Sequence, residues 1–263
     1  MRRQVTAHLT LEVTEPALLA LQIAVAAPDA DEQLTITRDG SPERAREVAS
    51  PHGGRVHLLE AGTGEVVIDY AASVEGKLPS PATSDHDLLS YRQPSRYCPS
   101  DRFLATAAAE FGEIEDTGEL VRSVVRWVGR RLIYIEGSSG PSDDAVDTLL
   151  LGEGVCRDYA HLVLSLLRAR DVPARLAAVY APGLFSMDFH AVVEAWVDGE
   201  WRVVDATGLA PRSSLLRIAT GRDAADTAFL SIYNGSADLI SVGVVAVVDE
   251  LPMDNRDDTV TLG

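Results

Sequence analysis

Near the middle of the chain, a cysteine opens an apolar helix in the segment Gly152-Glu153-Gly154-Val155-Cys156-Arg157-Asp158-Tyr159-Ala160-His161. The partial positive charge of a helix N-terminus favours the thiolate of Cys156, which is the nucleophilic form of the side chain. On its own, a free cysteine is more often a small buried hydrophobe than a nucleophile. Here, however, a histidine and an aspartate follow downstream, His190 and Asp205. The pattern predicts a Cys-His-Asp triad for acyl transfer.

The overall composition is typical of a soluble protein with an acidic surface. Of the 263 residues, 46% are hydrophobic and 24% are charged, and the formal net charge is −17. A nucleic-acid-binding protein would carry a basic face, and no cluster of lysines and arginines supplies one. Anionic membrane surfaces are disfavoured for the same reason. We therefore expect neither a nucleic acid nor a membrane as a partner.

The N-terminus contains two arginines but no continuous apolar segment after them, which argues against a signal peptide. No stretch approaches the roughly 18 apolar residues of a membrane span. We therefore expect a cytoplasmic protein. A reducing compartment argues against a disulfide bond between the two cysteines, Cys98 and Cys156.

The chain divides into a strand-rich start and a mixed remainder. Residues 1–78 contain short runs of β-branched residues separated by Pro, Gly and Asp, which predict a small β-sandwich. Residues 79–100 contain four prolines and are expected to form a connector. Residues 101–263 are expected to form an α+β domain. Within that domain we expect helices over about 101–111, 117–128, 144–151 and 156–172, irregular structure over 208–236, a last strand over 239–248 and a loosely held acidic tail.

A predicted hairpin brings two of the three candidate residues together. Asp198-Gly199 is a strong hairpin signal between two apolar runs. If these two residues form the whole loop, Val197 pairs with Glu200, and Asp205 becomes a diagonal neighbour of His190 on the same face. Such neighbours lie about 7–8 Å apart at the backbone, within reach of a carboxylate and an imidazole. A three-residue loop would turn one side chain to the other face.

Other titratable residues near the segment have simpler interpretations. His161 lies five positions after Cys156, about 140° around the helix, so it is expected to face elsewhere. Asp158 lies in the first turn and is expected to cap backbone amides or to support the site indirectly. Cys98 lies in the proline-rich connector and is expected to be structural. Cys156 has no companion at metal-ligand spacing, so neither a metal nor a cofactor is implied.

The residues around the three candidate positions form four motifs: Gly154-Val155-Cys156-Arg157-Asp158-Tyr159-Ala160-His161, Pro173-Ala174-Arg175, His190-Ala191 with Glu194-Ala195-Trp196, and Trp201-Arg202-Val203-Val204-Asp205-Ala206-Thr207. These motifs resemble the bacterial transglutaminase-like proteins, which belong to the papain-like cysteine superfamily. Two flanking segments resemble that family as well: Tyr91 with Pro94-Ser95-Arg96-Tyr97-Cys98, and Gly221-Arg222-Asp223-Ala224-Ala225-Asp226. Two positions depart from the family pattern, since its His-Ala-Trp reads His190-Ala191-Val192 here and its Asp-Pro-Thr reads Asp205-Ala206-Thr207.

The resemblance implies a β-sandwich followed by a papain-like α+β domain with thiol chemistry on amide or peptide bonds. In this interpretation Cys156 is the nucleophile, His190 the base and acid, and Asp205 the residue that orients the imidazole. The backbone amide of Cys156 is expected to contribute to an oxyanion hole. Tyr134 and Trp127 are weaker candidates for residues of the oxyanion hole or cleft.

The amino-acid sequence is compatible with three functions. Hydrolysis of a peptide or protein amide is favoured, because transfer to an amine requires a closed, aromatic-walled cleft and Val192 replaces one wall residue. A protein-glutamine amine transferase has the same triad. A binding or scaffold module that retains the triad without using it is the third.

Overall fold

The structure is a computed structural model that describes residues 1–255 and 258–262. Its strands are β1 (Arg2–Glu15), β2 (Ala17–Leu21), β3 (Asp31–Arg38), β4 (Ser41–Glu43), β5 (Arg46–Ala49), β6 (Arg55–Ala61), β7 (Gly64–Glu75), β8 (Ile133–Tyr134), β9 (Glu153–Gly154), β10 (Ala174–Tyr180), β11 (Phe189–Val197), β12 (Glu200–Val204), β13 (Leu216–Gly221), β14 (Leu230–Tyr233) and β15 (Ser236–Val248). The helices are α1 (Asp85–Ser90), α2 (Leu104–Phe111), α3 (Thr117–Arg131), α4 (Ala145–Leu151), α5 (Cys156–Arg168) and α6 (Ala224–Thr227). Three short 3₁₀ helices are η1 (Pro51–Gly53), η2 (Ser100–Phe103) and η3 (Arg212–Ser214).

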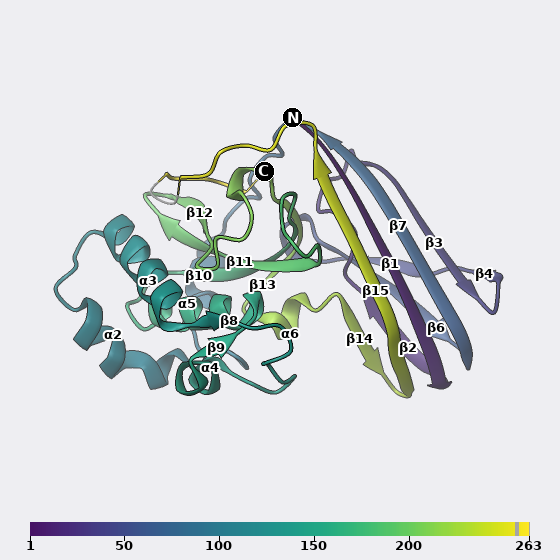
Figure 1. The fold of residues 1–263 in the computed structure, drawn as a ribbon, viewed down its shortest axis with the longest axis horizontal. Coiled ribbons are helices and arrows are strands. Elements are labelled where there is room, and N and C mark those ends of the chain that lie inside the picture. Colours follow the sequence, from purple (N-terminus) through teal and green to yellow (C-terminus); the bar gives the residue numbers. More distant parts are fainter. Residues whose placement is uncertain (256–257, 263) are drawn as a thin grey trace.

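One side of the molecule is built from two antiparallel sheets. A five-stranded sheet has the order β15-β1-β7-β3-β4, and a four-stranded sheet has the order β14-β2-β6-β5 (Figure 1). Alternate residues of β1 are buried, as expected for a strand with one face on a core and the other in solvent. The buried apolar residues of these strands form one hydrophobic cluster.

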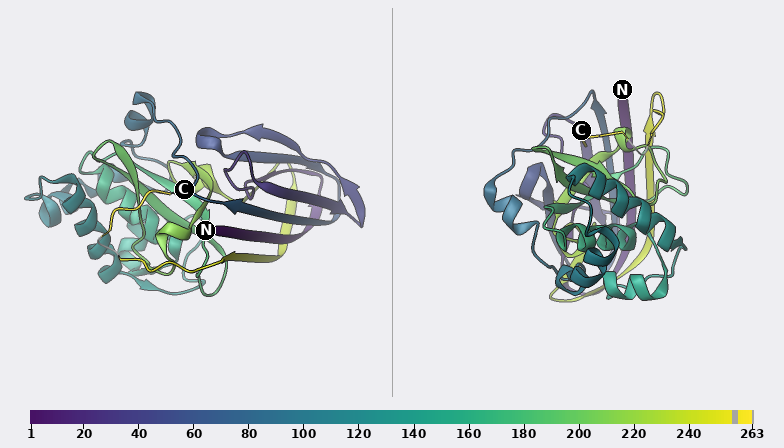
Figure 2. Two further views of the ribbon diagram at one scale, coloured as in Figure 1. Left: turned by 90° about the horizontal axis from the view of Figure 1, so that it is seen from above. Right: turned by 90° about the vertical axis from the view of Figure 1, so that its left-hand side faces the viewer.

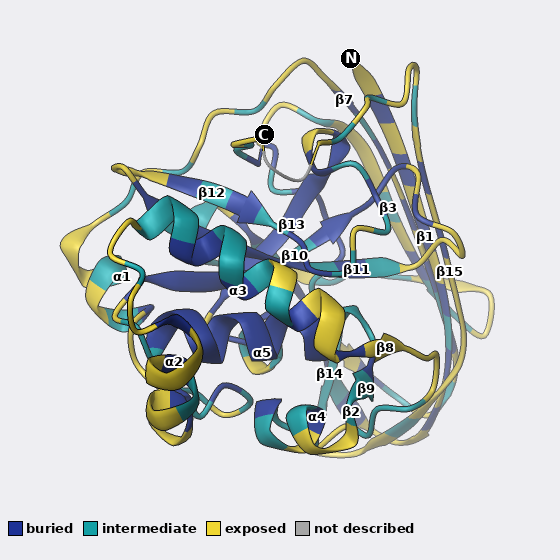
Figure 3. Ribbon diagram, turned by 60° about the vertical axis from the view of Figure 1, so that its left-hand side comes forward, coloured by how far each residue is buried: buried dark blue, intermediate teal, exposed yellow. Residues whose placement is uncertain are grey.

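The other side of the molecule is a four-stranded sheet with helices packed against it. Its order is β12-β11-β10-β13, and α5 packs against β10 and β11 (Figures 1 and 2). Residues 158–168 of α5 are all buried, and most of this helix is dark blue in Figure 3. Each buried Leu or Val of such a helix contributes about 1.5–3 kcal/mol of hydrophobic free energy. The molecule therefore has the expected α+β fold, with the cysteine helix at the centre of its second part.

Helix α4, which precedes the cysteine helix, matches the helix expected over residues 144–151. Asp144 caps α4 by accepting hydrogen bonds from the amides of Val146 and Asp147, at 2.7 and 3.2 Å. Gly152 ends α4 in the left-handed conformation with φ of 73°, where glycine carries no side-chain penalty. The turn before Cys156 is therefore set by local sequence.

The last strands of the chain return to the first sheets. β15 pairs with β1, and β14 pairs with β2. The expected division placed residues 101–263 together, so the sandwich contains a segment that the sequence analysis assigned to the second part. Long-range pairing between the two ends of the chain leaves no local signal, since an apolar strand can join either sheet.

Residues 208–236, expected to be irregular, contain β13, α6 and β14. β13 is the fourth strand of the central sheet, next to β10. Arg217 interrupts its apolar run, and this charge is compensated only in the folded protein, by Glu194 at 2.9 Å. The expectation of irregular structure over residues 208–236 is therefore wrong for β13, because the residue that compensates Arg217 is distant in the sequence.

The acidic tail is held against the second part of the molecule. Asp254 accepts hydrogen bonds from the Arg212 guanidinium at 2.9 and 3.0 Å, and the Val203 amide donates to the Val260 carbonyl at 2.8 Å. Leu262 is buried. The expectation of a loose tail is therefore wrong for these residues. Among the described residues, no helix has the length and apolar character needed to cross a membrane.

Candidate active site

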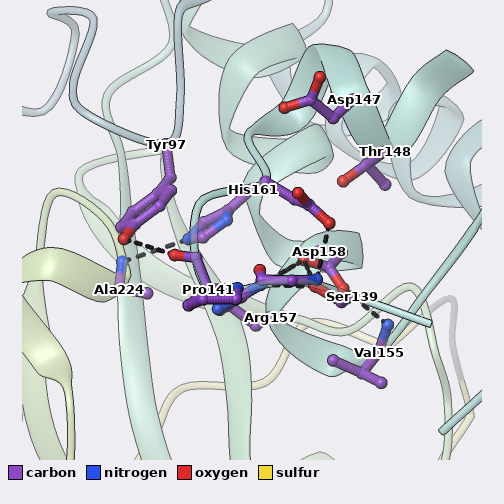
Figure 4. Close-up of polar contacts among 12 residues, drawn as sticks. Tyr97, Ser139, Pro141, Asp147, Thr148, Val155, Arg157, Asp158, His161 and Ala224 are labelled. Carbon is purple, nitrogen blue, oxygen red and sulfur yellow. Dashed lines mark hydrogen bonds and ion pairs between the residues drawn. The ribbon is translucent and has the colours of Figure 1, made fainter. Parts of the chain in front are cut away.

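Cys156 is the first residue of α5, and its turn is fixed by Asp158. The Asp158 carboxylate accepts a hydrogen bond from the Val155 amide at 2.9 Å (Figure 4). Asp158 is only 1% exposed. A Cβ added at Gly154 would lie 2.7 Å from the Asp158 Cβ, closer than real Cβ atoms approach one another. The capping role expected for Asp158 is confirmed, and the close approach explains the glycine.

The same carboxylate ties a preceding loop to the start of α5. The Ser139 hydroxyl donates to Asp158 Oδ1 at 2.9 Å, and the Arg157 side chain donates to that oxygen at 3.3 Å (Figure 4). Arg157 also donates to the Gly140 carbonyl at 2.7 Å. This loop follows β8, so the contacts fix β8 and its Tyr134 relative to Cys156.

The hairpin between β11 and β12 has the predicted register. Val197 pairs with Glu200 across the two-residue loop. Asp198 and Gly199 both have positive φ, 52° and 80°, as a turn matched to twisted strands requires. The register brings His190 Nε2 and Asp205 Oδ2 within 2.8 Å of each other.

The environment of Asp205 keeps its carboxylate charged and oriented. Its second oxygen accepts hydrogen bonds from the Thr207 amide at 2.8 Å and the Thr207 hydroxyl at 2.7 Å. Burial alone would raise the pKa of Asp205, but the charge and hydrogen bond of His190, with the Thr207 bonds, hold it below the usual value. Thr207 is the residue of this site to which the sequence analysis assigned no role. An Asx-turn from Asp205 to the residue two positions later is the signal that could have found it.

The imidazole of His190 is buried between Asp205 and the thiol. Its Nδ1 has no hydrogen-bond partner among the described residues. Burial lowers the pKa of His190, but the charge and hydrogen bond of Asp205, with a further contribution from the Cys156 thiol, raise it to about 10. The structure therefore places Nε2 on the carboxylate and leaves Nδ1 available to the thiol.

A buried ion network holds the strand that carries His190. Glu194, also on β11, accepts hydrogen bonds from Arg175 of β10 at 2.8 Å and from Arg217 of β13 at 2.9 Å. Burial would raise the pKa of Glu194, but the two guanidinium groups lower it to about 2. The network joins three neighbouring strands, and its three members lie far apart in the sequence.

Tyr134 lies beside the cysteine turn. β8 and β9 run parallel, with Tyr134 opposite Gly154, and the Tyr134 ring centroid is 6.0 Å from that of Tyr159. Burial raises the pKa of Tyr134 to about 12, and the Cys156 thiol adds to this rise. A hydrogen bond with the Cys156 backbone opposes it. The Tyr134 hydroxyl is thus next to the thiol and the backbone of Cys156.

Trp127 has different neighbours. Its indole donates to the Glu110 carboxylate at 3.1 Å, and its ring packs edge-on against Phe111 at 6.1 Å. These contacts lie between α2 and α3. Trp127 therefore packs between two helices. Of the two candidates for the cleft, Tyr134 is the one that lies beside Cys156.

His161 and Cys98 also lie apart from the candidate site. His161 Nε2 accepts a hydrogen bond from the Ala224 amide at 3.2 Å, and its ring stacks on Tyr97 with centroids 5.2 Å apart (Figure 4). Burial, with nearby arginines, lowers the pKa of His161 well below its ordinary value. Cys98 is a free, fully buried thiol whose pKa is raised to about 12 by burial.

Comparison with known proteins assigns the fold to a family. A sequence model of the transglutaminase-like superfamily matches residues 105–206. The crystal structure of a candidate cysteine protease from Cytophaga hutchinsonii is 32% identical, with a TM-score of 0.89, and the match covers 98% of this chain and 95% of that one. The chain belongs to the transglutaminase-like superfamily. An uncharacterised protein from Mycobacterium leprae is 28% identical over 152 residues, and this chain spans about half of its length, since the match covers 54% of each.

Val192 and Ala206, the two positions at which this transglutaminase-like protein departs from the family pattern, both make apolar contacts. Val192 is 1% exposed and belongs to a small cluster that includes Val203, and Ala206 is buried beside α3. A Cβ added at Gly129 of α3 would lie 2.9 Å from the Ala206 carbonyl oxygen, so the helix approaches this strand end closely. Among the described residues, no group of three or more His, Cys, Asp or Glu side chains could hold a metal ion.

Proposed function

We propose that the protein is a cysteine hydrolase that cleaves amide or peptide bonds through Cys156, His190 and Asp205. The observation that carries the proposal is the buried hydrogen bond between His190 Nε2 and Asp205 Oδ2, at 2.8 Å, with Nδ1 left toward the thiol. An orienting carboxylate on one nitrogen and a nucleophile beside the other are the arrangement that acyl transfer needs.

The electrostatics support a thiolate–imidazolium pair. A His190 pKa raised to about 10 keeps the imidazole protonated at neutral pH. Its positive charge stabilises a thiolate at Cys156, and the helix N-terminus adds to that effect. In the proposed reaction the thiolate attacks the carbonyl carbon of the substrate. The imidazolium then gives its proton to the leaving amine, and a water molecule attacks the thioester with His190 as its base.

Two donors are available for the oxyanion that forms during attack. The amide of Cys156 lies at the first turn of α5, where backbone N–H groups have no helical partner. The Tyr134 hydroxyl lies beside the Cys156 backbone and thiol. We propose that these two groups form the oxyanion hole, since donors aimed at the developing charge stabilise the transition state.

Water is the proposed acceptor, and the candidate protease activity of the relative from Cytophaga hutchinsonii supports that choice. Transfer to an amine uses the same three residues, so the test must separate the two acceptors. The whole protein is incubated with a peptide mixture that contains glutamine, with and without a primary amine such as putrescine. We expect shortened or deamidated peptides in both samples, none of them with the Cys156→Ala variant. Amine adducts as the main product would replace hydrolysis by transfer, and no product in either sample would favour a non-catalytic module.

A further inference from the structure

Two carboxylates outside the candidate triad lie on the segments that carry its neighbouring groups. Glu136 follows β8, two residues after Tyr134, and Asp188 immediately precedes β11, two residues before His190. Both acidic residues are exposed. Because Tyr134 and His190 are the side chains beside the Cys156 thiol, a substrate bound at that thiol would lie close to both carboxylates.

The backbone after β8 places Glu136 on the same side as Tyr134. The Ile135 amide donates to the Gly154 carbonyl at 3.2 Å, so the extended pairing with β9 continues past Tyr134. Side chains alternate along an extended segment, which puts Glu136 on the face of Tyr134 and Ile135 on the other face. The Tyr134 hydroxyl lies beside the Cys156 backbone and thiol. Glu136 therefore lies on the thiol side of this segment.

Asp188 lies near the same groups, at the start of β11. Its carboxylate accepts a hydrogen bond from the Phe189 amide at 2.7 Å. Burial raises the pKa of Asp188 and the charge of Glu136 adds to the rise, whereas the Phe189 hydrogen bond and His190 oppose it. Burial likewise raises the pKa of Tyr134, and the charges of Glu136 and Asp188 contribute to that rise. The two carboxylates are thus close enough for their charges to act on each other and on Tyr134.

Neither carboxylate forms an ion pair with any residue in the described part of the chain. Arg157, the basic residue that follows the nucleophile, donates instead to Asp158 at 3.3 Å and to the Gly140 carbonyl at 2.7 Å. The charge of a His190 imidazolium is balanced by the Asp205 carboxylate at 2.8 Å and by the proposed thiolate. A cationic group in front of the thiol would therefore meet two carboxylates that have no other counter-charge among the described residues.

We propose that Glu136 and Asp188 recognise a cationic group on the substrate, such as a lysine or arginine side chain beside the amide bond that is cleaved. The inference rests on the proposed function, because it concerns the substrate of the same thiol. Ammonium and guanidinium groups have several N–H donors, so one such group can bind carboxylates from two separate segments. The two residues would then select the substrate without taking part in the chemical step.

The first test measures how the charge of a reagent affects its reaction with Cys156 in the full chain. Two methanethiosulfonates of similar size are compared, one with a trimethylammonium group and one with a sulfonate group, and the modified cysteine is identified by peptide mass spectrometry. Both reagents react with the same thiolate, so the ratio of their rates is independent of the thiolate fraction. The cationic reagent should be favoured more strongly than it is with N-acetylcysteine amide, and less so as sodium chloride is added.

Variants assign this effect to the two carboxylates. Glu136→Gln and Asp188→Asn keep the shape of each side chain, and each should lower the rate ratio about fivefold, because a lost negative charge slows the cation and speeds the anion. The matched control is Glu12→Gln, an exposed position of β1 on the sandwich, which should keep the wild-type ratio. A wild-type ratio in the Glu136→Gln/Asp188→Asn double variant would refute the inference. No reaction of Cys156 with either reagent would overturn the proposed function as well.

The second test maps the bonds that the protein cleaves. A pool of peptides produced by cleavage after glutamate is incubated with the wild type and with Cys156→Ala, and the bonds cut only by the wild type are identified by mass spectrometry. Lysine or arginine should be enriched beside these bonds, and its side relative to the bond shows whether the acyl or the amine part carries the charge. Cleavage without enrichment would refute this inference and leave the hydrolase. Absence of cleavage would contradict the proposed function, and the reagent ratio would then decide whether the site recognises cations.

Discussion

Replacing Asp205 by asparagine should convert the His190 imidazolium into a neutral imidazole whose proton is on Nδ1. The Thr207 amide can only donate, so the oxygen of Asn at position 205 is held toward Thr207 and its NH₂ group faces His190. Nε2 of His190 then has to accept that hydrogen bond, so the imidazolium loses its Nε2 proton and keeps the one on Nδ1, the nitrogen that faces the thiol. A neutral amide also cannot stabilise an imidazolium, so the pKa of His190 should fall. The variant should therefore lose the activated form of Cys156.

The expected loss can be worked out at pH 6. In the wild type, a His190 pKa of about 10 keeps the imidazole protonated beside the thiolate. In the variant the charged hydrogen bond that supports the imidazolium is lost; such a bond is worth about 1.5–3 kcal/mol, which corresponds to a factor of roughly 10 to 100 in the population of the thiolate–imidazolium pair. A more basic thiolate is the better nucleophile, which recovers part of the difference. The rate of alkylation at pH 6 should therefore fall about tenfold.

The assay is alkylation by iodoacetamide from pH 4 to 10, with the modified cysteine quantified by peptide mass spectrometry. At pH 6 the wild-type rate should be about ten times the Asp205→Asn rate. Asp198→Asn is the matched control, because this position lies in the turn of the same hairpin and Asn tolerates positive φ there. A profile for Asp205→Asn that coincides with that of the control would refute the link between Asp205, His190 and Cys156.

Three further outcomes follow from the structure. Cys98 should resist iodoacetamide in the folded protein, because burial raises its pKa to about 12; peptide mapping that finds Cys98 labelled first would contradict this. Glu194→Gln should lower the free energy of unfolding at pH 7 by about 3–5 kcal/mol in urea titrations, since it breaks a buried ion network. Because the pKa of Glu194 is lowered to about 2, its contribution is present above about pH 4.3 and is lost as the pH falls toward 2, so a pH-independent difference would be inconsistent. Gly154→Ala should cost about 1–3 kcal/mol by the same titration, because its Cβ meets Asp158, and an unchanged midpoint would count against that contact.

The sequence predicts the elements that carry the candidate triad, because their signals are local. The helix expected over residues 144–151 is α4, which ends at Gly152. The Asp198-Gly199 loop fixes the register of the hairpin and so brings His190 to Asp205. A two-residue turn leaves few alternative pairing registers for its strands, so the relative position of His190 and Asp205 could be predicted from it.

Features that depend on distant partners could not be predicted in the same way. The position of Tyr134 depends on a two-residue parallel pairing with β9, which has no sequence signature. Arg217 looks unsuited to a buried strand until Glu194 is placed beside it. The pairing of β15 with β1 joins strands from the two ends of the chain, and no local sequence pattern indicates it. Trp127 was a candidate by residue type, and its neighbours on α2 became visible only in the fold.

The most direct test of the proposed triad is to trap the acyl-enzyme. The protein is mixed with p-nitrophenyl acetate, release of nitrophenol is followed for a burst, and the acetylated peptide is identified by mass spectrometry. We predict a burst close to one equivalent with the acetyl group on Cys156, no burst with Cys156→Ala, and a much slower one with His190→Ala. Acetylation at another residue, or an equal burst from Cys156→Ala, would contradict the assignment of Cys156 as the nucleophile.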